Sequence, residues 1–179
     1  ETDATGVSSS LASNPLDLKR EMVAAGLETS DLDAGSCTGQ PRRAVRRMGD
    51  PTAAVLGGVA VGALETDTPV TLAGGTQLLA VAALARHADA DGRLSLATTS
   101  FVDADPNVDL SAAADTFELD VTVTDPGFDE SHVAFERYLA GEAKEGVGMG
   151  GALAVADAAG VPMADVREGV ISVYERLLG

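Results

Sequence analysis

A glycine-rich segment between two apolar helical patterns carries the residues best suited to chemistry. It runs from Gly141 to Gly151 and reads Gly-Glu-Ala-Lys-Glu-Gly-Val-Gly-Met-Gly-Gly. Glycine has an entropic cost in a folded chain, and it is tolerated where the backbone turns sharply or comes close to a ligand. Glu145, held in such a segment beside a substrate, could act as a general base. The alternative is a connection between two helices, with a glycine C-cap and solvated charges.

Three other segments offer hydroxyl groups and backbone N–H groups just after a predicted strand. They are the serine run at residues 8–10, followed by Lys19, the turn at residues 74–77, and the run at residues 98–100. Ligands of an open parallel sheet bind beyond the carboxyl ends of its strands. The turn at residues 74–77 also begins a predicted helix, and a helix N-terminus attracts anions. Taken singly, each segment could be a turn or a close strand–helix contact. Together they favour an anionic ligand such as a nucleotide phosphate.

The elements that must position these segments alternate along the chain. Asn14 and Asp50 each precede a proline and predict helix starts, whereas Gly26 predicts a helix end. Strands are predicted at residues 5–10, 69–73, 94–98 and 119–123, and helices at 15–25, 42–47, 51–64, 77–87, 130–140, 149–159 and 163–177. This order predicts an α/β fold, a Rossmann-like three-layer arrangement with helices on both faces of a parallel sheet, plus a C-terminal helical cap. We expect one domain over residues 1–179, with the sheet in 1–128 and the helical part in 129–179.

Residues 146–151 match the pattern G-x-G-x-x-G, which in some proteins binds dinucleotides. That site requires a strand before the glycines and a helix after them, inside a strand–helix–strand unit. Here the preceding residues, 135–140, have a helical pattern. We therefore expect no dinucleotide cofactor at this segment, and no cofactor elsewhere.

Composition excludes several classes of function. The formal net charge is −16, and the acidic residues are spread along the chain, as in proteins of salt-loving organisms. Such a surface argues against nucleic-acid binding, which needs a basic face. No apolar run is long enough for a membrane span. One cysteine, Cys37, and two histidines, His87 and His132, form neither a disulfide nor a convincing zinc site, and they fit a reducing cytoplasm. A catalytic pair of Cys37 with a histidine is not favoured, because neither histidine lies in a recognisable motif.

Several of these segments together resemble one enzyme family. They are residues 7–10, 49–51, 70–77 and 141–151. The chain resembles the archaeal branch of the nicotinate-nucleotide–dimethylbenzimidazole phosphoribosyltransferases over nearly its whole length, and Lys-Glu-Gly-Val-Gly is the most specific part. Members of that family are longer, so we expect this chain to be a C-terminal half.

The resemblance implies transfer of ribose 5-phosphate from nicotinate mononucleotide to a benzimidazole-type aromatic base, which makes the lower-ligand nucleotide of cobamides. It implies that Glu145 is the catalytic base, that Lys19 contacts the phosphate, and that the protein is a homodimer. The other implied substrate contacts are Ser9, Ser10, Gly74, Gly75, Thr76, Thr98, Thr99, Gly146 and Gly148. Two alternatives remain open: a non-catalytic nucleotide-binding or regulatory protein with the same fold, and a structural half that completes a site with a separate upstream chain. The role of Lys144 and of the basic cluster at residues 42–47 is also open; we favour a solvated helix face for the cluster.

Overall fold

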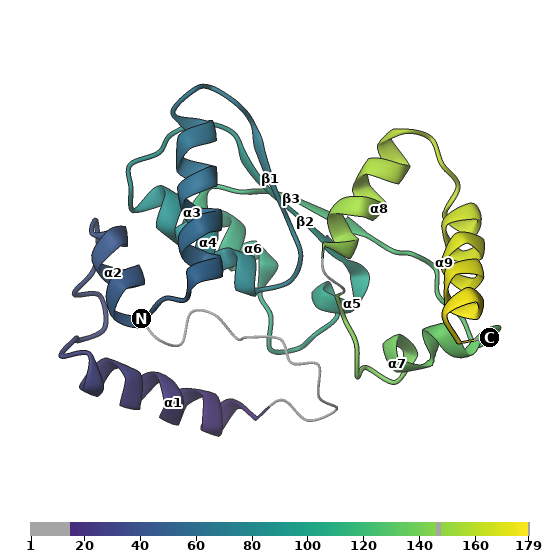
Figure 1. Cartoon of the computed structure of the whole chain (residues 1–179), viewed down its shortest axis with the longest axis horizontal. Coiled ribbons are helices and arrows are strands. Elements are labelled where there is room, and N and C mark those ends of the chain that lie inside the picture. Colours follow the sequence, from purple (N-terminus) through teal and green to yellow (C-terminus); the bar gives the residue numbers. More distant parts are fainter. Residues whose placement is uncertain (1–14, 146–147, 179) are drawn as a thin grey trace.

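The computed structural model describes residues 15–145 and 148–178. Its centre is a sheet of three parallel strands, β1 (Val70–Ala73), β2 (Leu94–Thr99) and β3 (Asp120–Thr124), in the order β1-β2-β3 (Figure 1). The register pairs Leu72 with Leu96, and Leu96 with Val121. The predicted strand at residues 5–10, together with Asn14, lies outside the described residues.

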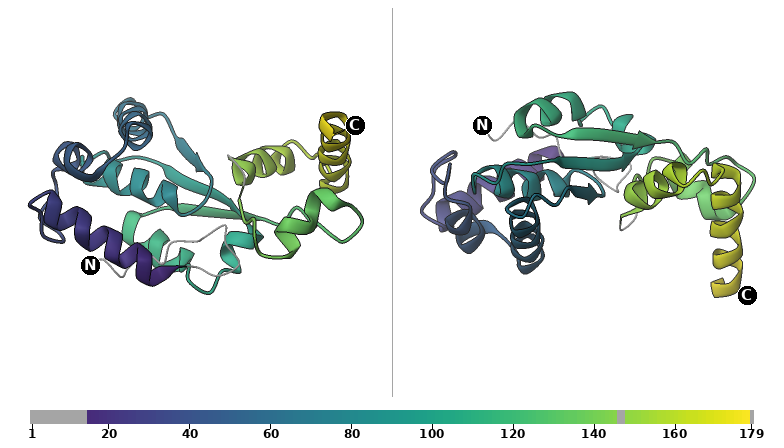
Figure 2. Two further views of the ribbon diagram at one scale, coloured as in Figure 1. Left: turned by 60° about the horizontal axis from the view of Figure 1, so that its bottom comes forward. Right: turned by 90° about the horizontal axis from the view of Figure 1, so that it is seen from above.

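Helices account for most of the remaining chain (Figures 1 and 2). In chain order they are α1 (Leu16–Thr29), α2 (Pro41–Met48), α3 (Pro51–Leu64), α4 (Gln77–Arg86), α5 (Ser100–Asp103), α6 (Leu110–Phe117), the 3-10 helix η1 (Val133–Phe135), α7 (Glu136–Leu139), α8 (Met149–Ala158) and α9 (Met163–Leu178). The predicted α/β class, with helices around a parallel sheet and further helices at the C-terminal end, is confirmed.

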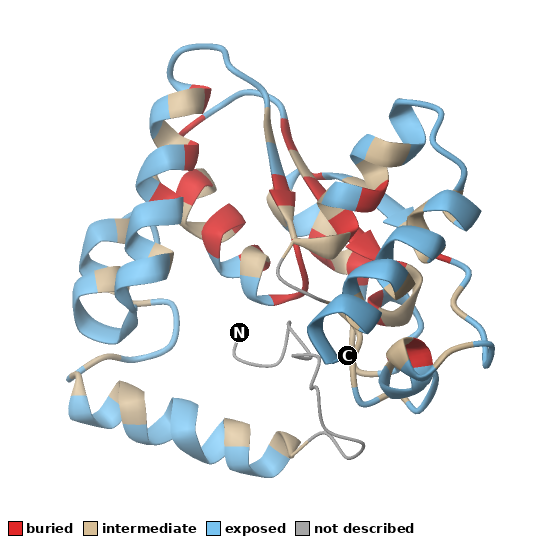
Figure 3. Cartoon of the chain, turned by 45° about the vertical axis from the view of Figure 1, so that its right-hand side comes forward, coloured by how far each residue is buried: buried red, intermediate tan, exposed pale blue. Residues whose placement is uncertain are grey.

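The two faces of the sheet have different partners because successive strand residues point to opposite sides. Leu72, Leu94 and Leu96 point to one side, where they share a buried core with residues of α3, α4 and α6. Ala73 points to the other side, where α8 packs against the strands. Figure 3 shows the buried residues concentrated in the sheet and in the helices next to it. The sheet is therefore covered on both faces near the carboxyl ends of its strands.

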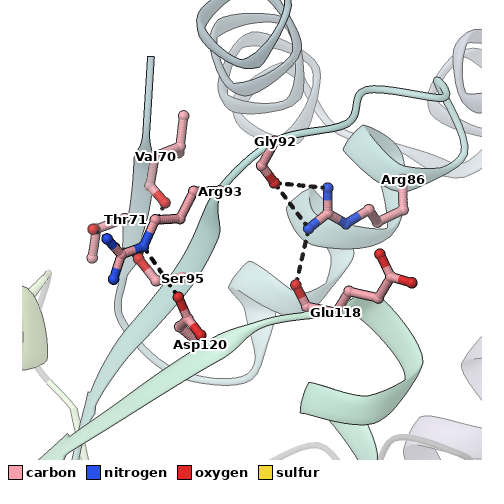
Figure 4. A network of polar contacts seen from close by, with 8 residues as sticks. All are labelled: Val70, Thr71, Arg86, Gly92, Arg93, Ser95, Glu118 and Asp120. Carbon is pink, nitrogen blue, oxygen red and sulfur yellow. Dashed lines mark hydrogen bonds and ion pairs between the residues drawn. The ribbon is translucent and has the colours of Figure 1, made fainter. Parts of the chain in front are cut away.

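Arg86 secures the opposite end of the sheet. It lies in the last turn of α4 and donates to the carbonyl oxygens of Phe117 at 2.8 Å, Ala90 at 2.9 Å and Glu118 at 2.9 Å. Ala90 and Glu118 belong to the connections that lead into β2 and β3, so one side chain fixes the entry of both strands. Figure 4 shows Arg86 with Glu118 and with Gly92, whose carbonyl oxygen also accepts from this side chain. Arg93 and Asp120 add an exposed ion pair at 3.2 Å across the same end of the sheet.

Most predicted elements match the structure to within a few residues, but the end of the first helix was predicted wrongly. Gly26 lies inside α1, which continues to Thr29. A Cβ atom on Gly26 would come within 2.8 Å of Met48 Cε, so the Met48 side chain of α2 occupies the space beside this glycine, which does not end the helix. The predicted helix start at Asp50 is confirmed, because Asp50 caps α3 and its Oδ1 accepts from Ala53 N at 2.9 Å.

Two helices were not predicted and one was predicted too long. The four-residue α5 follows β2 without a loop, and α6 has only eight residues, too few for a clear helical period. Asp109 caps α6 by accepting from Ala112 N at 2.8 Å. The helix predicted at residues 130–140 is instead the short η1–α7 pair, which begins where His132 Nδ1 accepts from Ala134 N.

Candidate functional site

The glycines that open α8 bring this helix into direct contact with the strand ends. A Cβ atom on Gly150 would overlap Thr98 Cα and Ala97 O, and one on Gly151 would overlap Ala73 Cβ. Only residues without a side chain allow the helix to approach β1 and β2 this closely. The residues before these glycines form α7 and a turn, not a strand, so the dinucleotide motif lacks its required context.

Two contacts hold the loop before α8 against the end of β2. Thr99, the last residue of β2, donates from Oγ1 to the carbonyl oxygen of Lys144. Lys144 Nζ lies 2.7 Å from Oδ2 of Asp105, whose side chain is fully buried, while that of Lys144 is 17% exposed. Asp105 Oδ1 in turn accepts from the backbone and side chain of Asn107 at 2.9 Å. The loop is thus anchored through its main chain and through a buried ion pair.

Glu145 extends from this anchored loop toward the strand ends. Its Oε1 accepts from Gly150 N at 2.9 Å, and its Oε2 is buried with no hydrogen-bond partner among the described residues. Burial raises the pKa of the Glu145 carboxyl group, an effect partly opposed by the backbone N–H groups of Gly150 and Met149. A carboxylate with one unpaired oxygen and a raised pKa is suited to accept a proton.

The structure brings several predicted residues together around Glu145. A Cβ atom on Gly75 would lie 3.8 Å from Glu145 Cβ, and one on Gly148 would lie 3.8 Å from Ala73 O. Gly74 has a φ of 152°, a conformation that L side chains rarely adopt, so β1 can turn directly into α4. The candidates that lie at this edge are Gly74, Gly75, Thr76, Thr98, Thr99, Glu145 and Gly148.

The threonines of this edge differ in their bonding. Thr98 and Thr99 are fully buried, and Thr76 is 8% exposed. The hydroxyl of Thr99 is used by the loop, whereas that of Thr98 is buried without a partner among the described residues. Thr76 is the N-cap residue of α4 and makes no side-chain capping bond there. A buried hydroxyl that has no partner within the protein is free to bond a ligand or a water molecule.

An aromatic cluster adjoins the same loop, in a chain with only 3% aromatic residues. Phe101 follows the end of β2 and lies 5.5 Å from Tyr138 and 5.9 Å from Phe128 between ring centroids. Phe128 stacks on the buried Phe135 at 4.3 Å. Burial, followed by the negative charge of Glu145, raises the pKa of Tyr138. Tyr138 is therefore close enough to Glu145 to sense its charge, and Phe101 and Phe128 pack against Tyr138.

Other candidates are not brought to this edge or lie outside the described residues. Lys19 belongs to α1, which lies apart from α8 in all three views of Figures 1 and 2. The arginines of α2 are exposed and also lie away from α8. Ser9, Ser10 and Gly146 fall in the parts of the chain that the structure leaves undescribed. The roles of all these residues stay predictions.

A separate apolar pocket of about 320 Å³ lies between α1, α2 and α4. Cys37 and His87 both line it, and Cys37 is a free thiol. Within residues 15–145 and 148–178, no group of three or more His, Cys, Asp or Glu side chains is arranged to bind a metal ion. No helix in that part of the chain has the length and apolar character needed to cross a membrane.

Sequence reasoning missed Asp105 and the aromatic residues of this site. Asp105 and Lys144 are 39 positions apart, so no local pattern connects them. The aromatic signal was present, because Phe128, Phe135 and Tyr138 concentrate in one short stretch of an aromatic-poor chain. Weighing that concentration against the composition would have indicated a cluster beside the glycine-rich loop.

No family model matches the chain. Among known proteins it is similar to a UPF0284 protein of the halophile Halobacterium salinarum, with 53% identity over 96% of this chain and 52% of the relative. UPF0284 proteins of Methanothermobacter thermautotrophicus and Thermococcus kodakarensis are 42% and 36% identical over 96% of this chain, and over 48% and 51% of their own lengths. The chain thus spans about half the length of the curated relatives it matches. Their shared description states no reaction.

Proposed function

We propose that this chain supplies the catalytic base and the sheet-edge loops for phosphoribosyl transfer from nicotinate mononucleotide to a benzimidazole-type base. The observation that carries the proposal is Glu145 at the carboxyl ends of a parallel sheet: its carboxyl group has a raised pKa, and its Oε2 has no hydrogen-bond partner among the described residues. The substrates come from the family resemblance of the loop sequence. The same resemblance makes the product the lower-ligand nucleotide of a cobamide.

In the proposed reaction, Glu145 removes a proton and makes no covalent bond. One ring nitrogen of the acceptor attacks C1′ of the ribose, and nicotinate leaves with the electron pair of the C1′–N bond. The proton on the other ring nitrogen must then be lost for the acceptor ring to become neutral. Glu145 accepts this proton as the new bond forms and later releases it to water.

The remaining groups of the edge would bind the substrates. The buried hydroxyl of Thr98 and the N-terminus of α4 at Thr76 supply donors for an anionic nucleotide. Gly74 and Gly75 let a ligand come close to the backbone beside Glu145. Lys144 is directed to Asp105, so its role in the proposal is to hold the loop, not to bind phosphate.

One observation favours a second candidate, a nucleotide-binding protein without turnover. Glu145 Oε1 accepts from Gly150 N in the first turn of α8, so the carboxylate also acts as a helix-capping group. A purely structural Glu145 would serve the fold without chemistry. The two candidates differ in what happens when Glu145 loses its charge.

The test is a mass-spectrometric search for the ribotide product from nicotinate mononucleotide and dimethylbenzimidazole in concentrated KCl. It uses the chain alone and the chain joined to the unmatched part of the Halobacterium salinarum relative. We expect product from the active protein and at least a hundredfold loss of kcat in Glu145→Gln. Because the base must be ionised, kcat/KM should rise with pH through the raised pKa of Glu145 and then level off.

Glu142→Gln is the matched control, because Glu142 lies in the same loop but pairs with exposed Arg137 at 3.4 Å. This variant should keep wild-type kcat. Calorimetry should show nicotinate mononucleotide bound equally by the wild type and by Glu145→Gln. Nucleotide binding without product in any protein would favour the second candidate, and full activity of Glu145→Gln would refute the role of the base.

A further inference from the structure

Helix α3 has an unusual composition for this protein. Its sequence, Pro-Thr-Ala-Ala-Val-Leu-Gly-Gly-Val-Ala-Val-Gly-Ala-Leu, contains no charged residue, although the formal net charge of the chain is −16. Charges stand immediately outside the helix, at Asp50 before it and Glu65 after it. A surface helix normally places charged or polar side chains on the face opposite the core, and α3 has none there except Thr52.

The inner face of α3 accounts for only part of this pattern. Gly57, Ala60 and Leu64 are buried, and a Cβ atom on Gly57 would lie 3.0 Å from Leu84 of α4. This row follows the helical period and fixes α3 against the core. The burial of these residues requires no apolar residue on the opposite side of the helix.

The outer α3 face consists of Val55, Gly58, Val59 and Gly62. Val55 is 64% exposed and Val59 65% exposed, and a Cβ atom on Gly58 or Gly62 would meet no atom within 4 Å. The valines are four residues apart, as are the glycines, so a valine ridge runs beside a glycine groove along one side of the helix. Figures 1 and 3 show this helix at the surface, with its outer side exposed.

A ridge beside a groove is the shape against which another apolar element packs closely. Exposed glycines inside a helix cost stability unless close contact compensates, because each weakens the helix relative to alanine. The outer α3 face thus has the composition and the shape of a covered surface. Nothing in residues 15–145 and 148–178 covers it.

We infer that the outer α3 face is the docking surface for the additional segment that the longer relatives carry outside the region aligned with this chain. The matched relatives are about twice as long as the aligned region, so each carries an additional segment of comparable size. The surface that this segment presents to α3 must be apolar, because the outer α3 face consists only of valine and glycine. A second copy of this chain is a poorer occupant, because two separate molecules meet only at their bulk concentration while a tethered segment remains at high local concentration.

Hydrogen exchange of the α3 amides tests the inference. The chain alone is compared with the chain joined to the unmatched part of the Halobacterium salinarum relative, both in the same concentrated KCl, with sedimentation to establish the mass. We expect exchange at residues 53–64 to slow at least tenfold in the joined protein while that protein sediments at the mass of one polypeptide. Val59→Glu should abolish this protection, because it places a charge in the contact.

Val155→Glu is the control, since Val155 of α8 is 72% exposed and lies on a different helix. It should leave α3 protection in the joined protein unchanged. Equal exchange rates at residues 53–64 with and without the added segment would overturn the inference. A second result would also overturn it: the chain alone sediments as a dimer with protected α3 amides, and Val59→Glu dissociates that dimer. The occupant would then be a second copy of the chain.

Discussion

At the scale of single residues, the basicity of Glu145 depends on which carboxylate pairs with the neighbouring Lys144. Lys144 directs its ammonium group to buried Asp105, away from Glu145. Had this lysine paired with Glu145, the opposite charge would have lowered the pKa of the glutamate. The ion pair therefore anchors the loop, and among the described residues Glu145 has no cationic partner. This separation of the two roles is the main reason the site is suited to proton abstraction.

We predict that Lys144→Met destabilises the protein by about 3 kcal/mol, because removing one partner leaves a buried charge without compensation. Urea unfolding in constant KCl measures this change. The double variant Lys144→Met with Asp105→Asn should lose less stability than the sum of the losses in the two single variants, because the double variant leaves no buried charge without a partner.

Arg93→Met is the matched control for this prediction. Arg93 and Asp120 form an ion pair whose side chains are 74% and 67% exposed, so its loss should cost under about 1 kcal/mol. Strictly additive effects of the Lys144 and Asp105 substitutions would show that the 2.7 Å contact does not couple the two residues energetically.

At the scale of elements, local signals explain what could be predicted. Asp50 followed by proline indicated the start of α3, and a short apolar run between Pro69 and Gly74 identified β1. The prediction from Gly26 was wrong because residue type alone does not distinguish a glycine inside a helix from one that ends it. Glu145 could be identified from the sequence because the glycines around it are its neighbours along the chain. The contacts of Thr99 and Asp105 with Lys144, which hold the loop of Glu145, form only when β2 and α5 fold beside that loop.

The contact of α8 with the strands gives a prediction at this scale. Gly150→Ala should destabilise the protein by about 1–3 kcal/mol, because the new methyl group overlaps the backbone at Thr98 and Ala97 and pushes α8 outward. The shift would also remove the Gly150 N–H from Glu145. Thermal unfolding followed by circular dichroism measures the loss.

Gly169→Ala provides the comparison for the same substitution in a helix. Gly169 lies in α9, and a Cβ atom there meets nothing within 4 Å. Alanine should stabilise α9 by about 0.5–1 kcal/mol, because glycine costs that much in a helix interior. If the two substitutions change the free energy of unfolding with opposite signs, the loss in Gly150→Ala comes from the contact of α8 with the strands. A stabilising Gly150→Ala would mean that α8 does not pack against β2 in solution.

At the scale of the whole molecule, the charge is not balanced by ion pairs. Ion pairs among the described residues include exposed ones, such as Arg93 with Asp120 and Arg137 with Glu142. Exposed pairs contribute little, so repulsion among the acidic residues opposes folding unless dissolved cations screen it. The core can offset this repulsion only in part, because it is built mainly from alanine, valine and leucine.

We therefore predict that the unfolding midpoint rises steeply with KCl up to about 1 M, where the Debye length falls to about 3 Å and screening is nearly complete. Each 1 kcal/mol of relieved repulsion should raise the midpoint by about 2–4 °C in a chain of this size. Differential scanning calorimetry across a KCl series measures the rise, and sucrose separates screening from preferential exclusion, because sucrose stabilises compact states without screening charge. A midpoint that rises as much in sucrose as in KCl, or that does not change below 1 M KCl, would show that repulsion among the surface carboxylates is not what opposes folding.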